Sequence, residues 1–475
     1  MSFLKYLTTI KVKNWPLMAA FVALLGPIFS PVMAFDVDLQ NDTIYQIMVD
    51  RFYDGDPSNN ATGNAFKYEM NTELDMHYMK GGDWQGVIDK MDYIQQMGFT
   101  AIWISPIADP QLWRMPAPDG SQFPAAYHGY NAVDPNRASR YFGDIDPQAS
   151  KEKLKELVDV AHQHGIKVII DVVPNHVGDF MAKDHYIYPQ NVEAGTQFQP
   201  VAPFNNLDFY HHNGDTDFDY ANALSRQDKM NYLEKTDLGS LDDIDYHNPQ
   251  AKDAMFNSIA NWFDYLGADA ARVDAAKSMF PSDINSLEKR LNVPTFGENF
   301  DGDAQFVNMW LGDQGEWGML DFPLYFAIQS SFLYGNDFNA DGGIKAALAN
   351  DAIYGNNAQR MVTFIDNHDR NRMLAESWGD TNKTKNAIAF IYAARGVPVV
   401  FQGTESEKGN YEGRYIEGPI KDSWNRWPMV EKDADGNVVE DNFQAVTATK
   451  QLIGKLNNAR QNHPALRYGK QREMW

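Results

Sequence analysis

Eight short β-rich runs alternate with amphipathic, helix-like windows from about residue 40 onward, and this alternation restricts the fold more than any other feature. Strands that alternate with helices favour a parallel sheet, and eight of them predict an α/β fold of the (β/α)8 TIM barrel type. In such a barrel the active site lies at the C-terminal ends of the strands. The expected strands are residues 43–49, 99–107, 166–173, 268–274, 294–299, 318–322, 360–367 and 397–403, and the clearest helical windows are 84–98, 150–165 and 385–396.

One connection is far too long for a simple loop between a strand and a helix. Between His176 and about Asp245 the chain is rich in Asn, Asp, His, Gly and aromatic residues, and its periodicity is weak. A connection of this length is usually functional or a small inserted subdomain. We therefore expect a small inserted subdomain at 177–245, after the third strand, between two parts of one barrel at 35–176 and 246–462.

The first 34 residues have the pattern of a secretory signal peptide. Three lysines precede an apolar run that Pro27 and Pro31 interrupt, and the small residue Ala34 follows it. A membrane anchor is the competing interpretation, but the run is interrupted and close to the lower length limit for a span. We exclude residues 1–34 from the fold, and we expect a secreted protein, extracellular or periplasmic, with no stable membrane insertion after signal removal.

Charge and cysteine content exclude several classes of function. The formal net charge of −23 argues against a nucleic-acid partner, because phosphate binding needs a clustered basic face. The chain has no cysteine, which excludes disulfides, thiol nucleophiles and cysteine-ligated zinc. The aromatic content of 13% suits sugar stacking and ordinary cores alike.

Polar side chains gather at the ends of four predicted strands. The run 362–365 leads directly into an Asp-Asn-His-Asp-Arg cluster, which is costly to desolvate in a core. His176, Glu298 and the pair Arg272 and Asp274 end three other runs, and residues two apart on a strand point to the same face. One such cluster is usually an ion pair or a helix cap. Four of them at different strand ends indicate a site at the mouth of the barrel.

Carboxylates on both sides of the scissile bond are what glycoside hydrolysis requires. The segments "DVVPNH", "ARVDAAK", "FGEN" and "FIDNHD", in this order, resemble the four motifs of the α-amylase superfamily. The resemblance covers nearly the whole chain after residue 34. It implies that Asp274 is the nucleophile, Glu298 the general acid/base and Asp369 the transition-state stabiliser. The substrate-binding residues that it implies are Tyr130 in "AYHGYN", His176, Arg272, Lys277 and His368.

The implied roles set physical requirements. Asp274 must stay ionised, and we expect the neighbouring Arg272 guanidinium to depress its pKa. Glu298 must carry a proton at the start, which a desolvated position near other carboxylates favours. A retaining mechanism would place the two carboxyl groups roughly 5–5.5 Å apart.

Four further segments resemble the cyclodextrin glucanotransferases: "YQIMVDRFYDGDPSNN", "KGGDWQGVIDKM", "FYHHNGDTDF" and "RGVPVVFQGTE". In that subgroup the first two segments form a calcium site, and oxygen ligands of mixed charge suit calcium. The resemblance therefore implies one or two structural Ca²⁺ ions. The matching positions are Asp54, Asp56, Asn59, Asn60, Gly81 and Asp83 for the first site, and Asn175, Asp243 and Ser278 for the second. Ser278 departs from the family's His, which acts through its backbone carbonyl.

Three activities fit these motifs. The first is an α-amylase that hydrolyses internal α-1,4 bonds of starch or maltooligosaccharides, the second a cyclodextrin glucanotransferase, and the third a non-catalytic glucan-binding homologue, which would lack a catalytic carboxylate. The cyclising enzymes carry an aromatic residue in the long connection, where we align Ala202, with Phe204 two residues away; this favours hydrolysis. Phe300 matches an acceptor-side aromatic of the transferases and favours the alternative.

Two further expectations come from the same resemblance. The segment "KDSWNR" resembles a donor-side sugar-binding segment of the transferases, which implies that Asp422 and Arg426 bind substrate. Residues 463–475 coincide with the start of the family's C-terminal β-domain, the rest of which is not present in the sequence. We expect a monomer whose partner is its glucan substrate.

Overall fold

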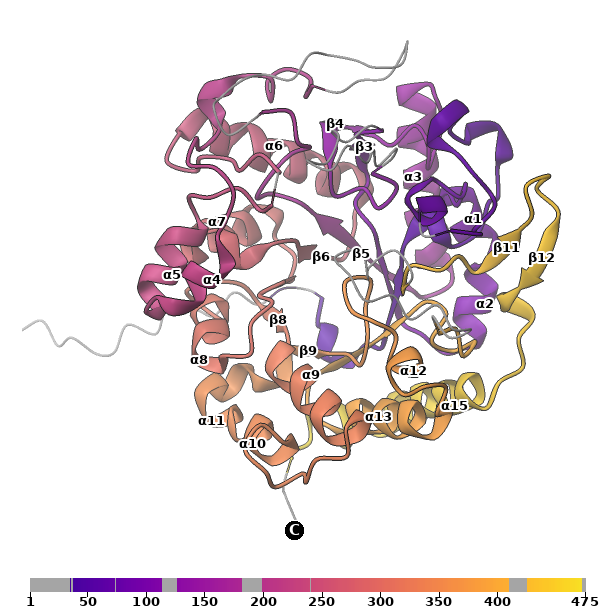
Figure 1. Ribbon diagram of the computed structural model, residues 1–475, viewed down its shortest axis with the longest axis vertical. Coiled ribbons are helices and arrows are strands. Elements are labelled where there is room, and N and C mark those ends of the chain that lie inside the picture. The colour runs from indigo at the N-terminus through magenta and orange to yellow at the C-terminus, as the bar shows by residue number, and fades with distance from the viewer. Residues whose placement is uncertain are drawn as a thin grey trace, which may run out of the picture. The chain divides into compact units, whose positions relative to one another are not determined.

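Eight parallel strands close into one barrel in the computed structural model, which describes residues 35, 37–72, 74–112, 126–181, 199–239, 241–409 and 425–471 (Figure 1). Around the barrel the strand order is β1-β10-β9-β8-β7-β6-β5-β2. The strands are β1 (Ile44–Ile47), β2 (Ala101–Ile104), β5 (Lys167–Val172), β6 (Ala270–Val273), β7 (Thr295–Gly297), β8 (Gly318–Leu320), β9 (Met361–Thr363) and β10 (Val397–Phe401). Each lies within one of the eight predicted runs, and the predicted (β/α)8 barrel is confirmed.

Both faces of the barrel strands are buried, which explains why the strands read as apolar runs. On β1, Ile44 belongs to the cluster inside the barrel, whereas Tyr45 packs in the larger cluster that includes helix residues. The inner face becomes polar toward the C-terminal strand ends, where Gln46, Asp171 and Arg272 are all buried. A polar layer therefore lies on top of an apolar one inside the same barrel.

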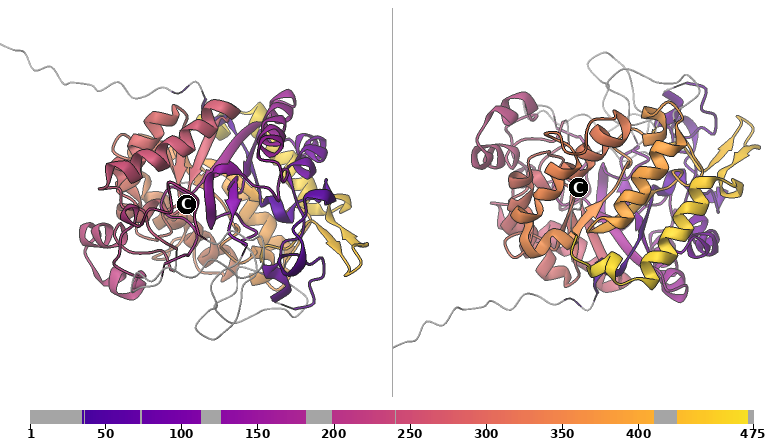
Figure 2. Two further views of the ribbon diagram at one scale, coloured as in Figure 1. Left: turned by 90° about the horizontal axis from the view of Figure 1, so that it is seen from above. Right: turned by 90° about the horizontal axis from the view of Figure 1, so that it is seen from below.

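The helices begin and end at local sequence signals. The side chain of Asn248 accepts hydrogen bonds from two amides of the first turn of α6, and Gly267 ends that helix with a φ of 68°. α13 and α15 lie side by side (Figure 2). The helices are α1 (Trp84–Asp89), α2 (Met91–Gln96), α3 (Pro147–Gln163), α4 (Phe218–Ala223), α5 (Arg226–Leu233), α6 (Pro249–Leu266), α7 (Pro281–Leu291), α8 (Ala304–Val307), α9 (Phe322–Ile328), α10 (Ile344–Ala349), α11 (Asp351–Tyr354), α12 (Met373–Glu376), α13 (Thr381–Ala393), α15 (Ala448–Asn462) and α16 (Ala465–Tyr468).

The long connection after β5, the third barrel strand in the chain, holds α4 and α5 and, in its described part, no barrel strand. Its last residues return to the barrel mouth, because the amide of Ile244 donates to the carbonyl of Asn175 at 2.9 Å. Residues 182–198 and Ser240 of this connection lie outside the described residues. The connection therefore borders the C-terminal end of β5.

Two small antiparallel sheets were not predicted. β3 (Ala108–Pro110) pairs with β4 (Ala132–Ala138), and β11 (Val430–Lys432) pairs with β12 (Val438–Asp441), which stands away from the barrel in Figures 1 and 2. β11 and β12 are half-buried or exposed, and charged residues outnumber their valines, so they lack the continuous apolar signal that marks the barrel strands. Residues 463–475 were expected to begin a β-domain. The described part of this stretch contains helix α16 and no strand.

Among the described residues, none of the helices has the length and hydrophobicity needed to span a membrane. The predicted signal peptide, residues 1–34, lies outside the described residues.

Candidate active site

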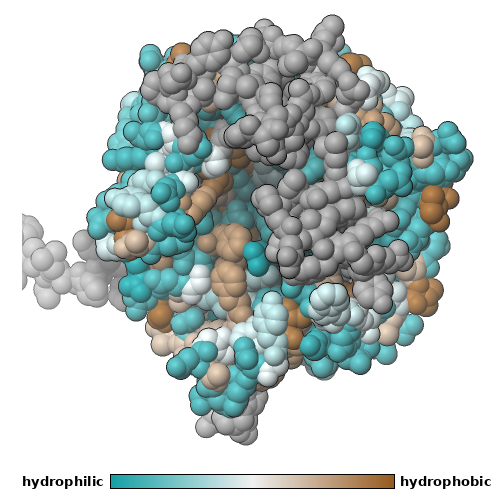
Figure 3. All heavy atoms as spheres, viewed as in Figure 1, coloured by the Kyte–Doolittle hydropathy of each residue, from teal (hydrophilic) through white to brown (hydrophobic). Residues whose placement is uncertain are grey.

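The three predicted catalytic carboxylates line one cavity of about 630 Å³. Asp274 directly follows β6, Glu298 directly follows β7, and Asp369 lies a few residues beyond β9. All three therefore lie at the C-terminal ends of their strands, at the same mouth of the barrel. In the space-filling view of Figure 3 the surface is hollowed near its centre, and hydrophobic side chains border the hollow.

Arg272 connects two of these carboxylates. Its guanidinium is fully buried and donates through Nη1 to Asp274 at 2.6 Å, while its Nη2 lies 2.9 Å from Glu298. Nη1 also contacts the buried carboxylate of Asp171 at 2.9 Å. A planar guanidinium bound on several sides fixes both active-site carboxylates relative to each other.

The prediction that Arg272 depresses the pKa of Asp274 is wrong. Burial raises the pKa of Asp274 well above its ordinary value; the Arg272 charge opposes this shift, and the negative charges of Glu298, Asp171 and Asp369 add to it. Desolvation and three nearby carboxylates thus outweigh one guanidinium in the free protein.

Asp369 shows the opposite balance. Burial acts to raise its pKa, but the charge and hydrogen bond of His368 and the charges of Arg426 and Arg272 outweigh burial and hold the pKa below its usual range. His368 Nε2 lies 3.0 Å from Asp369, and Arg426 Nη2 lies 2.8 Å from it on the other oxygen. Asp369 is therefore held as an anion next to Asp274, whose charge is disfavoured.

Tyr130 and the two predicted histidines surround these acids. The Tyr130 ring stacks on His368 with centroids 5.1 Å apart, and its hydroxyl donates to Asp171 at 2.7 Å. His176 lies 3.9 Å from Asp274, and burial lowers its pKa to about 4. Neither ring nitrogen of His176 hydrogen-bonds to another described side chain. A neutral imidazole at this position, with one donor and one acceptor nitrogen, suits a sugar hydroxyl.

Lys277 and Phe300 line another part of the cavity wall. Lys277 Nζ donates to the Phe300 carbonyl at 3.0 Å and lies 5.4 Å from the ring centre of Phe218 and 5.7 Å from that of Phe300. Arg426 also lines the cavity, and it contacts the predicted catalytic residue Asp369. Asp422, the other predicted donor-side residue, lies outside the described residues.

Sequence reasoning missed several residues of this site. Asp171 anchors Arg272 and Tyr130, and its signal was a lone charge within the apolar run "VIIDVV". Gln46 contacts His368 Nδ1 at 2.7 Å from the first strand, and nothing in its local sequence marks it. Ala275 adopts a left-handed conformation, with a φ of 50°, directly after Asp274. Such strain is typical of functional sites, and here it turns the Ala275 amide toward Glu298 at 3.4 Å.

The first predicted metal cluster is assembled around side-chain oxygens. Oδ1 of Asp54, Asn59 and Asn60 is buried in each case and accepts no hydrogen bond within the described structure. Asn60 Oδ1 also lies close to Gly81, where a side-chain Cβ would approach it to 2.4 Å. Asp83 is fully buried. Asp56 differs in part, since its Oδ1 accepts from the amide and hydroxyl of Ser58, and these two bonds leave Oδ2 available for the cluster.

The second predicted metal cluster is partly assembled. Asn175 Nδ2 contacts Asp243 Oδ1 at 2.6 Å, and both residues are buried. The Asn175 Oδ1 atom has no hydrogen-bond donor among the described residues. Ser278 is buried in the 3-10 turn Ala276–Ser278 and lines the cavity with Asp274.

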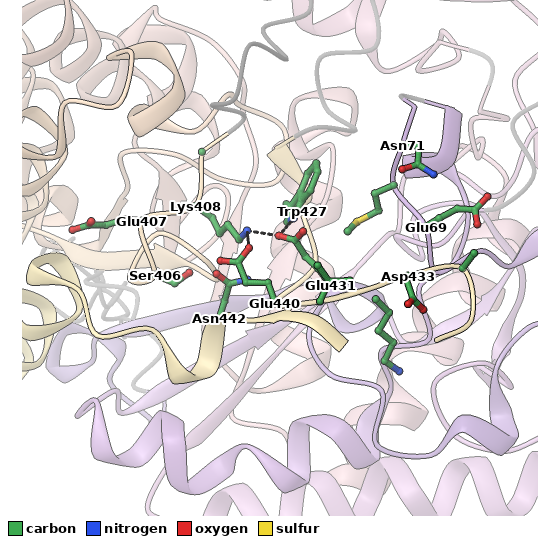
Figure 4. A pocket seen from close by; sticks show the side chains of 15 residues that line it. Glu69, Asn71, Ser406, Glu407, Lys408, Trp427, Glu431, Asp433, Glu440 and Asn442 are labelled. Carbon is green, nitrogen blue, oxygen red and sulfur yellow. Dashed lines mark hydrogen bonds and ion pairs between the residues drawn. The ribbon is translucent and has the colours of Figure 1, made fainter. Parts of the chain in front are cut away.

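A second pocket, of about 450 Å³, contains none of the predicted catalytic or substrate-binding residues (Figure 4). Three of its charged groups pair within the pocket: Lys408 pairs with Glu431 and Glu440, and the Trp427 indole donates to Glu431 at 2.6 Å. We therefore place the chemistry in the barrel mouth and not in this pocket.

Comparison with known proteins agrees with the geometry. The model of the family "Alpha amylase, catalytic domain" matches residues 46–294 and 283–451. The chain is 36% identical over 465 residues to a "Beta/alpha-amylase" of Paenibacillus polymyxa, covering 95% of this chain and 33% of that protein. It is 33% identical over 474 residues to a "Cyclomaltodextrin glucanotransferase" of Bacillus sp. (strain 38-2), covering 96% and 59%.

Among solved structures, the chain resembles CldA, "the first cyclomaltodextrin glucanotransferase with a three-domain ABC distribution", with a TM-score of 0.70 and 32% identity over 90% of this chain and 82% of that one. The chain spans a third to three fifths of the length of the two curated relatives named above. The family match covers most of the barrel and includes the strands that carry Arg272, Asp274, Glu298 and Asp369. The chain belongs to the α-amylase family and carries its catalytic domain.

Proposed function

We propose that this protein is a retaining α-glucan hydrolase that cleaves internal α-1,4 bonds of starch-like polysaccharides. The observation that carries the proposal is the buried Arg272, which binds Asp274 and Glu298 within one cavity that also contains Asp369. Two carboxyl groups held on a common partner provide the nucleophile and the proton donor of a double displacement. All three carboxylates are present, which argues against a non-catalytic homologue.

In the proposed reaction, the Asp274 carboxylate attacks the anomeric carbon while Glu298 protonates the departing glycosidic oxygen. Water then attacks the covalent intermediate, Glu298 accepts its proton, and Asp274 leaves as a carboxylate. Two inversions at one carbon restore the original configuration. The Asp369 carboxylate would stabilise the positive charge that develops on the sugar, and the neutral His176 would bind a hydroxyl group.

The aligned positions in the long connection support hydrolysis. Neither Ala202 nor Phe204 lines the cavity, and Phe204 is completely buried. Among the described residues of the connection, those that line the cavity are Phe218, Asn222, Leu238 and Leu241, and only Phe218 is aromatic. The position aligned with the aromatic residue of the cyclising enzymes therefore offers no ring around which a glucan chain would wrap. We infer that water competes effectively for the intermediate.

A second candidate, the cyclodextrin glucanotransferase activity, is favoured by the pair Phe218 and Phe300. Phe218 is 41% exposed at the start of α4, and both rings lie within 6 Å of the Lys277 ammonium on the cavity wall. Two aromatic rings near the same cation could hold an acceptor sugar in place of water. The similarity to cyclomaltodextrin glucanotransferases points the same way.

Product analysis decides between the two activities. We expect linear maltooligosaccharides to dominate the early products from soluble starch, and NMR of the fresh products to show the α-anomer. Glu298→Gln should lower both activities strongly, whereas Glu156→Gln, on the exposed face of α3, should have no effect. Early dominance of cyclic dextrins would establish the transferase. Near-full activity of Glu298→Gln would refute the catalytic assignment.

We also propose that Ca²⁺ binds the side chains of Asp54, Asp56, Asn59, Asn60 and Asp83 together with the Gly81 backbone carbonyl. Three buried oxygens without a hydrogen-bond donor from the described residues are a poor arrangement for an empty turn and a good one for a hard cation. Lys432 occupies only the other oxygen of Asp54, at 2.7 Å. A bound ion would neutralise the buried Asp83 carboxylate and hold this turn against α1.

A second Ca²⁺ is proposed at Asn175 and Asp243, with the Ser278 carbonyl as a further ligand. The unpartnered Asn175 oxygen and the fully buried Asp243 carboxylate, whose pKa burial raises well above its usual range, support a cation there. Its chemistry would be structural, since it would fix the long connection to the end of β5. Elemental analysis of the purified protein tests both ions.

We further propose that residues 1–34 are a signal peptide and that the mature protein is a secreted monomer. N-terminal sequencing of protein recovered from the culture medium and light scattering at several concentrations test these points. Retention of residues 1–34 in mature protein would overturn the first, and a constant dimer mass the second.

A further inference from the structure

Two histidines and two carboxylates meet where the long connection returns to the barrel. His211 follows a short 3-10 turn at Leu207–Phe209, Glu234 ends α5, and Asp245 and His247 precede α6. One ligand atom each of His211, Glu234 and His247 lies within 4.8 Å of the others. None of the four has a place in the mechanism proposed above.

Three of the distances among these atoms are close to those of a small coordination sphere, and the ligand atoms of His211, Glu234 and His247 all lie within 4.8 Å of one another. His211 Nε2 lies 3.1 Å from Asp245 Oδ1, His247 Nδ1 lies 3.3 Å from the same oxygen, and His247 Nδ1 lies 3.4 Å from Glu234 Oε1. Four ligands bound tetrahedrally at about 2.0–2.2 Å from a zinc ion would lie roughly 3.3–3.6 Å from one another. The observed spacings are close to that range.

Burial gives a second and independent indication. Glu234 is only 3% exposed, and neither of its carboxylate oxygens accepts a hydrogen bond from the described residues. A buried carboxylate without a donor is costly, and the His247 ring nitrogen lies 3.4 Å from it. A cation at the centre of the cluster would remove this cost.

The tautomer of His211 supports the same conclusion. Its Nδ1 lies 2.7 Å from the buried Asp243 carboxyl group. When that group is ionised, as it would be next to a bound Ca²⁺ ion, it can only accept a hydrogen bond, so Nδ1 then carries the ring proton. In the neutral ring the lone pair of Nε2 then faces the Asp245 carboxylate at 3.1 Å, and two lone pairs repel. A carboxylate that orients a histidine from behind is the usual second-shell arrangement of zinc sites.

We propose that His211, Glu234, Asp245 and His247 form a binding site for a divalent transition-metal ion of the zinc class. The ion would fasten α5, the 3-10 turn and the start of α6 to one another. The site is distinct from the two proposed calcium sites, because its donors include two imidazole nitrogens, which calcium disfavours. It does not depend on the proposed reaction.

Metal titration of the full chain, prepared without a histidine tag, tests this proposal. The protein is stripped with chelator, returned to excess Ca²⁺ so that oxygen-only sites are filled, and titrated with Zn²⁺ by calorimetry and with Co²⁺ by visible absorption. We expect one tight Zn²⁺ per chain and the absorption bands of tetrahedral Co²⁺. His247→Gln and Glu234→Gln should each weaken binding by at least roughly tenfold.

His212→Gln is the matched control, because the His212 ring contacts the Leu207 carbonyl and lies outside the cluster. This variant should bind Zn²⁺ like the parent. Circular dichroism establishes that each variant is folded, and His247 is a safe position because its side chain is 60% exposed. The proposal is overturned if the folded parent protein binds no Zn²⁺ in the presence of Ca²⁺, or if His247→Gln and His212→Gln bind it equally.

Discussion

Asp83 provides a test of the first calcium proposal, because bound Ca²⁺ should reverse the sign of the pH dependence of stability. The side chain is fully buried, and burial raises its pKa from 3.8 to about 6 although three backbone amides donate to it. Without a metal ion, the folded state therefore binds the Asp83 proton more tightly than the unfolded state. This contribution to stability is complete below about pH 4 and is lost as the pH rises through about 6.

The size of the effect follows from the two pKa values. The difference between 3.8 and about 6 corresponds to about 3 kcal/mol. With an unfolding entropy of about 2 cal/mol/K per residue, a chain of this length would lose about 3 °C in melting temperature over the whole titration. About 2 °C of this loss falls between pH 4 and pH 6. Bound Ca²⁺ reverses the slope, because a carboxylate that coordinates the ion resists protonation and the ion stabilises the folded state by mass action.

The assay is differential scanning calorimetry at several pH values from 4 to 7, in excess chelator and in excess Ca²⁺. Asp83→Asn keeps a residue that can cap α1 but removes the titrating group, so its melting temperature should lose this share of the pH dependence under both conditions. Asp89→Asn, an exposed position on the same helix, should behave like the parent. Identical pH slopes of the parent protein with chelator and with Ca²⁺ would refute the reasoning.

Three further outcomes are expected from the active site. Glu298→Gln should lower kcat by about 10²–10⁴-fold, the usual contribution of a general acid, and initial rates on starch measure this. Because burial raises the Asp274 pKa, kcat/KM should begin to fall, as the pH is lowered, at a higher pH than an ordinary aspartate would give; a midpoint near pH 4 in the pH–rate profile would contradict this. Arg426→Ala should impair cleavage of long and short maltooligosaccharides alike, because Arg426 binds Asp369; a selective loss on long substrates would instead support a donor-side role.

The barrel strands and the three carboxylates could be predicted from the sequence because both have local signals. A run buried on both faces is apolar over its whole length, and each carboxylate directly follows or closely trails such a run. The pKa of Asp274 could not be predicted in the same way. It depends on carboxylates from several strands, and the sequence shows only the adjacent Arg272.

Contacts between segments that lie far apart in the sequence could not be predicted either. Arg426 reaches Asp369 across 57 positions, and the short motif around it resembled a sugar-binding segment. Alignment of the long connection from its "HHNG" segment points to Ala202, whereas Phe218, Leu238 and Leu241 of the connection border the cavity. The zinc-class cluster draws on three separate stretches of the connection, none of which has the spacing of a metal motif.

The closure of the barrel also has a consequence for how the chain folds during synthesis. β1 pairs with β2 on one side and with β10 on the other, and the Tyr45 hydroxyl at its centre contacts Glu405, 360 positions away. Until β10 leaves the ribosome, one edge of β1 has no partner strand, and such an edge can pair with another chain. Folding of this domain should therefore be slow and of high contact order. Fragments that end before residue 397 should aggregate, whereas fragments that include β10 and α15 should remain soluble.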